Sequence, residues 1–334
     1  MKTITKSNEF MLAMIILVVW LLFGMINPDI LSLANIFSLS RAIIVPSIFA
    51  LTSMLIIISG GFDMSFYAIG SFSAYFVTKY VMDHGMENIS IFAIFGASII
   101  ISILLECINW VFIDKMSVDP FIVTLGTQVL LKGLLLAFVS TSFVNVLPNQ
   151  MLAVSKSYLA TTVDANGMSY ILHMTILIVI VLYVVIHFIL EKTMYGRSLY
   201  ALGNDVIAAH RAGINVSKVR FITFVICGVI CGVGGVIHTS LARMAAPMSS
   251  DMVGQELLVI AAVMIGTGSS KRAKGSVVCT FLGVILLKLI TNNLILLKVP
   301  SYWQNIVYGV VVLIGLIART PNLIKRLKGK EETV

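Results

Sequence analysis

Charged residues are scarce in this chain. Asp, Glu, Lys and Arg make up 11% of its 334 residues, whereas a soluble domain carries about 25%. The chain therefore lacks the charge to cover a surface that faces water, which argues against a soluble enzyme. By contrast, 59% of the residues are hydrophobic and the mean hydropathy is +1.02. This composition suffices for roughly ten membrane-spanning helices of ~20 residues each.

Motifs that carry catalysis or bind metals are also missing. The sequence contains no GxxxxGK(S/T) loop for nucleotide phosphates, no HExxH and no GxSxG. The histidines are scattered, and none stands at metal-ligand spacing from another. We therefore expect no catalytic residue, no metal site, no cofactor and no ATPase site of its own. The cysteines lie in apolar runs, and we interpret them as small buried residues. They are Cys107, Cys227, Cys231 and Cys279.

The long apolar runs predict an all-α, polytopic membrane protein with about ten transmembrane helices. The eighth run is short for a span and has the length of a half-helix. The breaks between the runs carry Pro, Gly, Asn and Asp. No soluble domain fits between them, so residues 1–334 form a single transmembrane domain. The runs are 10–26, 42–58, 64–82, 89–113, 121–139, 169–190, 220–241, 256–268, 276–297 and 302–318.

The positive charges predict how the chain is oriented. With the N-terminus inside and ten spans, sixteen of the 23 Lys and Arg residues fall in cytoplasmic segments and five in external ones. This split follows the positive-inside rule. It places both termini, the loop 191–219 and the basic tail 319–334 in the cytoplasm. It also accounts for the net charge of +8 without nucleic acid as a partner, and leaves membrane lipid as the surroundings.

Two charged residues lie deep in apolar runs, Glu106 in the fourth and Lys132 in the fifth. Intramembrane charges are costly, so they are either functional or paired. One interpretation is a proton or ion path, as in a secondary transporter driven by an ion gradient. The other, which we favour, is a Glu106–Lys132 pair or side chains that reach toward an interface. Lys288, in the ninth run, has no obvious partner.

The loop 191–219 has the pattern of a short docking helix. Asn204 or Asp205 can cap it, Ala208 and Ala209 favour helix, and Gly213 can end it in a left-handed conformation. A helix of about two turns is marginal in water by itself. We therefore expect it to dock into another protein, although an ordinary connecting loop stays open as an alternative.

This loop resembles the coupling-helix loop in permease subunits of bacterial ABC importers of the ribose, or simple-sugar, branch. The resemblance extends along most of the chain. Residues 59–65 resemble the family's Gly-Gly-x-Asp-hydrophobic-Ser segment, 120–126 its P-x-F-I-x-T-L-G start, and 254–263 its G-x-E-L-x-x-I-A-A-V segment. The residues shared in the loop are Gly196, Arg197, Tyr200, Ala201, Gly203, Ala208, Ala209, Gly213, Ile214 and Val216.

The resemblance implies a transport subunit of the bacterial inner membrane that works by alternating access. Its partners would be a second permease subunit (identical or related), cytoplasmic ATP-binding subunits, and an extracytoplasmic solute-binding protein docking on 27–41, 140–168 and 242–253. A pentose or hexose is the default solute, with autoinducer 2, a nucleoside or an amino acid as alternatives. The residues expected to couple to the ATPase are Gly203, Asn204, Asp205, Ala208, Ala209 and Gly213.

Candidates for the translocation path or its gating follow from polar groups and backbone breaks. Gly60 and Gly61 interrupt two apolar runs, and Asp63 can cap the helix that follows. Glu256 starts the eighth run, where a carboxylate is favoured by the helix dipole or contacts the solute. Amides suit a hydroxyl-rich ligand, but helix–helix bonding uses them equally often, and we favour packing. These amides are Asn292 and Asn293.

Two further patterns concern packing and symmetry. Gly228 and Gly232 form a GxxxG pair, which predicts close helix packing within the subunit or across a dimer. A weak internal repeat relates 59–76 to 266–283 and 120–138 to 300–318. Such a repeat is typical of transporters whose path lies between repeats.

Overall fold

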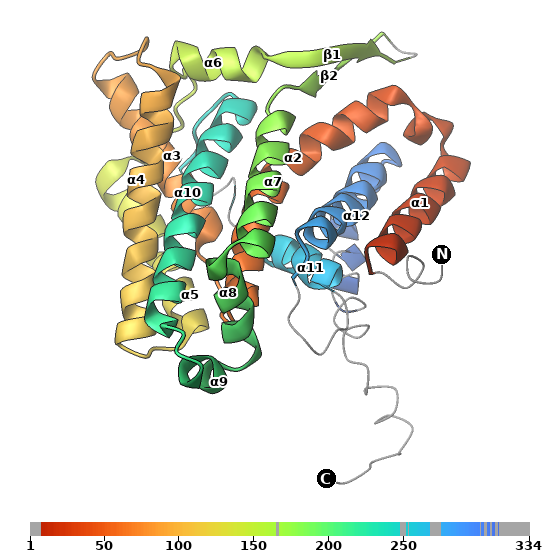
Figure 1. The fold of residues 1–334 in the computed structure, drawn as a ribbon. Coiled ribbons are helices and arrows are strands. Elements are labelled where there is room, and N and C mark those ends of the chain that lie inside the picture. Colours follow the sequence, from red (N-terminus) through yellow and green to blue (C-terminus); the bar gives the residue numbers. More distant parts are fainter. Residues whose placement is uncertain are drawn as a thin grey trace.

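The computed structural model describes residues 8–164, 167–247, 252, 254–267 and 275–300, with 302, 303, 306, 307, 309, 310 and 313. It is mainly helical (Figure 1). The helices are α1 (Asn8–Ile26), α2 (Leu33–Ile58), α3 (Phe66–Asp83), α4 (Ile91–Trp110), α5 (Pro120–Leu134), α6 (Asn149–Lys156), α7 (Ile176–Lys192), α8 (Met194–Asn204), α9 (Val206–Arg211), α10 (Val216–Ala242), α11 (Glu256–Thr267) and α12 (Val277–Leu296).

Within this described part, six helices are long and apolar enough to cross a membrane, or seven if the bent pair α7–α8 is one span. The chain is thus a polytopic α-helical membrane protein. Of the other expected spans, α3 has 18 residues but carries several Ser, Tyr and Thr side chains. The helix α11 is short, with 12 residues, as its run predicted. The run 302–318 lies largely outside the described residues, and the tail 319–334 lies wholly outside them.

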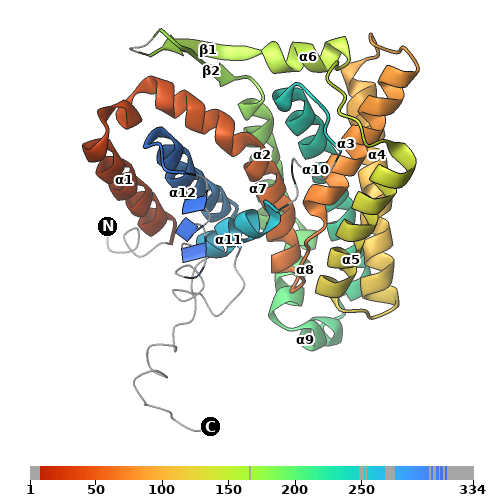
Figure 2. The ribbon, with the colours of Figure 1, turned by 180° about the vertical axis from the view of Figure 1, so that it is seen from behind.

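The helices form one bundle with two different ends. In Figures 1 and 2, α3, α4, α5 and α10 lie on one side, α1 and α12 on the other, and α2 and α7 between them. One end is covered by α6 and a β-hairpin, whereas α8 and α9 form the opposite end (Figure 1). Aromatic rings pack in the core, where the centroids of the Phe49 and Tyr67 rings lie 4.3 Å apart with the rings tilted by 34°. The connecting segments therefore lie at the two ends of a buried apolar core.

The hairpin departs from the all-helical expectation. Strand β1 (Tyr158–Val163) pairs antiparallel with β2 (Ser169–His173), and Gly167 in the turn has a φ of 80°. The sixth span was expected to begin at residue 169, but helix α7 begins at Ile176. The prediction was wrong there because apolar β-branched and aromatic residues suit a half-buried strand as well as a span.

The segments expected to be external loops are also more ordered than predicted. Residues 27–41 contain a 3-10 turn, η2 (Pro28–Leu31), and the start of α2, whose Ser32 cap accepts a bond from the Asn35 amide at 3.2 Å. Helix α2 continues through Pro46 and curves along its length in Figure 1, as a proline inside a helix favours. Residues 140–168 contain α6 and β1. Residues 248–251 and 253 of the third segment lie outside the described part.

Helices α4 and α10 pack unusually close. A Cβ on Gly228 would come within 2.6 Å of the Ile103 Cα, and one on Gly232 within 2.6 Å of the Ile99 Cα. The Ser98 hydroxyl also donates to the Gly232 carbonyl at 3.2 Å. The GxxxG pair therefore serves packing within this chain, and it brings the backbones of α4 and α10 into close contact.

Candidate functional site

Helix α9 is a short, capped and exposed helix at the end of the bundle opposite the hairpin (Figure 1). The Asp205 carboxylate caps it by accepting from the amides of Ile207 at 2.9 Å and Ala208 at 3.0 Å. Gly213 follows with a φ of 82°, a conformation that favours glycine. The predicted capped helix with a glycine end is thus confirmed as local structure, with Asp205 as its cap.

The residues expected to couple to a partner do not all face outward. Asn204, Asp205, Ala208 and Gly213 are exposed, and so is the apolar Ile207 at 66%. Ala209, in contrast, is buried at 4% exposure against the rest of the chain. A partner that docks on α9 would therefore meet the face that carries Ile207 and Ala208.

Helix α8 was not anticipated from the sequence. It leaves α7 at an angle of 76°, and the Thr193 hydroxyl caps it by accepting from the Gly196 amide at 3.2 Å. Leu199 and Leu202 are buried on its inner face. A threonine cap followed by two leucines three residues apart predicts a helix. The sequence analysis missed it because glycines, which are typical of loops, lie on either side of the two leucines.

Gly203 places the end of α8 directly on the end of α2. A Cβ at Gly203 would lie 2.9 Å from the Ile58 carbonyl carbon, closer still to its oxygen, and 3.7 Å from the Gly60 amide nitrogen. Gly60 has a φ of 82°. The structure thus brings together two glycines predicted separately, one for coupling and one for gating, in a backbone-to-backbone contact that excludes any side chain. Tyr200 adds a hydrogen bond to the Gly275 carbonyl at 2.7 Å.

Asp63 follows the Gly60–Gly61 turn in the chain and begins a buried polar network. Its carboxylate accepts from the Ser65 amide at 2.6 Å and the Ser65 hydroxyl at 2.7 Å. Since α3 begins at Phe66 with Ser65 as its N-cap residue, Asp63 holds the residue before the helix rather than capping the first turn. The Ser65 hydroxyl in turn accepts from the Asn109 amide of α4 at 2.9 Å.

Glu106 lies further along the same network and is fully buried. Asn109 donates to it at 3.4 Å and the Cys231 thiol at 3.8 Å. The predicted Glu106–Lys132 pair was wrong, because no ion pair joins these two described residues. The residue of α5 at this level is Thr127, which donates to Asn109 at 2.7 Å, and Lys132 lies more than one helical turn beyond it.

Helix α5 also holds Glu256, the buried carboxylate at the start of α11. Gln128 donates to this carboxylate at 2.7 Å, and the Gly254 amide donates at 2.6 Å. Sequence reasoning missed Gln128, although an amide in an apolar run was a usable signal. Gln128 therefore bonds α5 directly to the carboxylate of α11, whereas Thr127 reaches the carboxylate of α4 only through Asn109.

The two asparagines of α12 bond to another helix. Asn35 of α2 donates to Asn293 at 3.1 Å and accepts from Asn292 at 3.1 Å. This geometry matches the packing interpretation of the two amides. The sequence indicated no role for Asn35, because its partners lie in a distant part of the chain.

The cysteines and metal ligands add no further site within the described residues. All four cysteines are free; Cys107 is half-buried and the other three are buried. No group of three or more His, Cys, Asp and Glu side chains that could hold a metal occurs among these residues.

The fold and these contacts define the class of the molecule: a multi-pass helical membrane protein with polar groups buried between its helices and a small helical segment at one end. Residues 35–316 match the family described as branched-chain amino acid transport system / permease component. The chain belongs to this family of transport permeases, and the resemblance to permeases of ribose-type ABC importers is confirmed.

Several curated relatives align over nearly the whole chain. The ribose import permease protein RbsC of Haemophilus influenzae is 30% identical over 92% of this chain and 91% of its own length. RbsC of Escherichia coli K12 is 28% identical over 93% and 92%. The autoinducer 2 import system permease protein LsrC of Enterobacter sp. is 26% identical over 94% and 87%. No solved structure matches.

Proposed function

We propose that this chain is the membrane-spanning subunit of an ATP-driven importer for a sugar or sugar-like solute. The observation that carries the proposal is the contact of Gly203 with Ile58, which braces the exposed α8–α9 segment against the break at Gly60. The names of the relatives, which import ribose or autoinducer 2, support a small hydroxyl-rich solute. Nucleosides and amino acids stand as alternative solutes.

The α8–α9 segment is the part of the chain that receives force. A separate ATP-binding subunit docks on α9, where Ile207 offers exposed apolar surface. When the ATPase subunits close, α9 and α8 are displaced together. Because Gly203 touches the α2 backbone without an intervening side chain, the displacement reaches the Gly60–Gly61 break and the Asp63–Ser65 contact behind it. Bundles that rock about such breaks alternate access between the two sides of the membrane.

The Gln128–Glu256 bond is the closing contact on the path. It joins α5 to the start of α11 with two buried side chains. Separation of the two helices breaks this bond and leaves an amide and a carboxylate able to bond a solute hydroxyl. The polar groups on the path are thus satisfied by each other in the closed state and by the solute in the open one.

Orientation and partners follow from the same proposal. The α9 end and both termini lie in the cytoplasm, in agreement with the sixteen-to-five distribution of Lys and Arg. The end with α6 and the hairpin then faces outward in the bacterial inner membrane and receives the solute-binding protein. A second permease subunit, identical or related, completes the transporter.

The test is reconstitution in lipid vesicles with the ATP-binding subunits and binding protein encoded by neighbouring reading frames. Uptake of labelled ribose, other pentoses, hexoses, autoinducer 2, a nucleoside and an amino acid is measured with and without ATP. We expect ATP-dependent uptake of one sugar or sugar-like solute, abolished when the phosphate-loop lysine of the ATPase is replaced. Uptake by this chain alone under an ion gradient would instead support the secondary transporter.

A further inference from the structure

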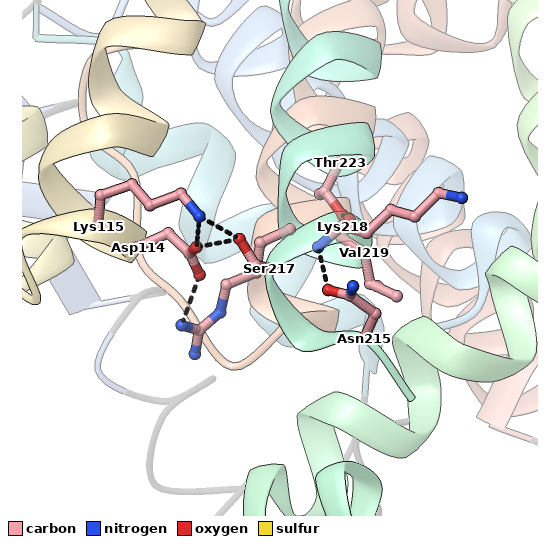
Figure 3. A network of polar contacts seen from close by, with 8 residues as sticks. Asp114, Lys115, Asn215, Ser217, Lys218, Val219 and Thr223 are labelled. Atoms are coloured by element: carbon pink, nitrogen blue, oxygen red, sulfur yellow. Dashed lines mark hydrogen bonds and ion pairs between the residues drawn. The ribbon is translucent and has the colours of Figure 1, made fainter. Parts of the chain in front are cut away.

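A buried acidic side chain ties the end of α4 to the start of α10 (Figure 3). Asp114 lies in η3 (Val111–Lys115), a π-helical turn that ends α4, and its side chain is only 7% exposed. The Ser217 hydroxyl donates to this carboxylate at 2.5 Å, and the Arg220 guanidinium lies 3.3 Å away. We call Asp114, Ser217 and Arg220 the α4–α10 latch.

The latch acts on the first turn of α10, immediately after α9. Ser217 and Arg220 both belong to the start of α10, whose cap Asn215 accepts from the Lys218 amide at 2.9 Å. A carboxylate beside a helix N-terminus is favoured by the helix dipole. Only a short turn through Gly213 separates this point from the end of α9. Any displacement of α9 therefore reaches the latch before it reaches the rest of α10.

The latch also lies next to the turn at Gly60, where helix α2 has ended. A small cavity of about 40 Å³ lies between Gly60, Gly61, Pro120 and Arg220. On the outer side, a larger cavity of about 550 Å³ lies between Asp114 and His210 of α9. The latch thus stands between the surface that α9 presents and the break that α8 touches through Gly203.

Deeper in the bundle, α4 and α10 are already joined by the close contacts of Gly228 and Gly232. The latch repeats this junction at the end where force enters. Asp114 is the buried partner of this contact, so loss of Arg220 would leave its charge poorly compensated. Lys115 adds an exposed contact to the latch: its side chain is 55% exposed, and its ammonium donates to the Ser217 hydroxyl at 3.1 Å and lies 4.0 Å from Asp114; such exposed pairs contribute little.

We propose that Asp114 is a positioning residue for energy coupling. It holds the first turn of α10 on α4, so that a push on α9 displaces α4 and α10 as one body. Without the latch, α9 moves relative to α4, and its displacement distorts the turn at Gly213 instead of moving α4 and α10. The inference rests on the proposed function, since it specifies how the force received by α9 enters the bundle.

The experiment measures solute taken up per ATP hydrolysed, in vesicles that hold the complete transporter. In Asp114→Asn, which keeps the side-chain size but removes the charge, we expect this ratio to fall about tenfold while ATP hydrolysis stays within about twofold of wild type. Asp114→Glu should restore most of the ratio. Lys218→Gln is the matched control in the first turn of α10: its side chain is exposed, its backbone amide bonds to the Asn215 cap, and the ratio should stay unchanged.

A second variant covers the case in which Asp114→Asn fails to assemble. Arg220→Gln removes the other charge, from a side chain that is 29% exposed, and should lower the ratio in the same direction. If the two residues act as one contact, the double variant is no worse than the single ones.

The outcomes separate the two proposals. Wild-type vesicles without ATP-dependent uptake would refute the proposed function itself. Wild-type vesicles that transport, together with an unchanged uptake per ATP in Asp114→Asn and Arg220→Gln, would overturn the latch alone. An equal loss of hydrolysis and uptake leaves the ratio unchanged, and it too would overturn the latch, because uptake per ATP is the quantity that the latch is proposed to set.

Discussion

Two of the contacts between the α8–α10 region and the rest of the bundle are of opposite kinds. At Gly203 the backbone of α8 touches the backbone of α2 with no room for a side chain. At Asp114 a buried carboxylate is held by a hydroxyl and a guanidinium. The first contact requires that residue 203 have no side chain. The second requires a charged group in the right orientation. A steric contact of the first kind fails with any added group, whereas a polar one tolerates a side chain of similar shape and charge.

The steric contact gives the largest expected effect. Gly203→Val places a branched side chain where a Cβ alone overlaps the Ile58 carbonyl, so α8 must move off α2. We expect ATP-driven uptake to be abolished, as measured in vesicles that hold the complete transporter. The matched control is Gly133→Val in α5, where a Cβ meets nothing within 4 Å. It should transport at close to the wild-type rate, and equal loss in both variants would contradict the steric explanation.

The second-largest effect is expected from α9, the helix that lies between the two contacts in the chain. Asp205→Ala removes the cap that accepts from the Ile207 and Ala208 amides, which costs about 1 kcal/mol. This cost lowers the equilibrium constant between helical and unfolded α9 roughly fivefold, and uptake per ATP should fall by at most that factor. Asp205→Asn keeps a capping oxygen and should behave nearly as wild type. A loss in Asp205→Asn as large as that in Asp205→Ala would show that the charge matters rather than the cap.

A smaller effect is expected at Glu106, which lies deeper in the buried polar network. Glu106→Gln keeps the size of the side chain and an oxygen that accepts from Asn109, so uptake driven by ATP should change by less than about twofold. The measurement is ATP-driven uptake in vesicles with and without an ion gradient. If wild-type uptake required the ion gradient and Glu106→Gln abolished it, Glu106 would carry an ion and the transporter would belong to another class.

The smallest effect is expected at the opposite end, far from both contacts. Burial lowers the pKa of His173 from its usual 6.5, and the nearby Arg41 and Arg243 lower it further. Because the unfolded hairpin binds the proton more readily than the folded one, the stabilisation is complete above pH ~6.5 and is lost as the pH falls below that value. The protection factors of the β1 and β2 amides, which correct for the pH dependence of intrinsic exchange, should therefore be lower at pH 5 than at pH 8. Protection factors that fall as much in His173→Gln would assign the effect to another group.

Local features were predictable from neighbouring residues. Asp205, the alanines and Gly213 predicted a capped helix with a glycine end because caps and helix propensity act within a few residues. The same reasoning missed α8, because its cap at Thr193 directly follows α7 and a glycine comes soon after it. It also extended a span into β2, because apolar alternation over five residues suits a strand and a helix alike.

The contacts between distant elements were not predictable in the same way. The sequence pointed to Gly60, Asp63 and Gly203 as separate candidates, and only the fold placed Gly203 on the Gly60 turn. Lys132 was chosen as the partner of Glu106 from its charge, but the position of α5 brings Thr127 to that level instead. Asn35 and Asp114 lacked any local signal, because each bonds to a side chain of another helix. Gln128 stood out as an amide in an apolar run, but its partner Glu256 could not be read from its neighbours.

The sequence by itself determined that this chain lies in a membrane, where its apolar runs begin and end, and that α9 is capped, because these properties depend on composition and on residues close together in the chain. The tertiary structure decided which polar groups are satisfied and by which partners. A carboxylate or glycine inside an apolar bundle acquires its role from the helix that packs against it, and that neighbour is set by the packing of the whole bundle.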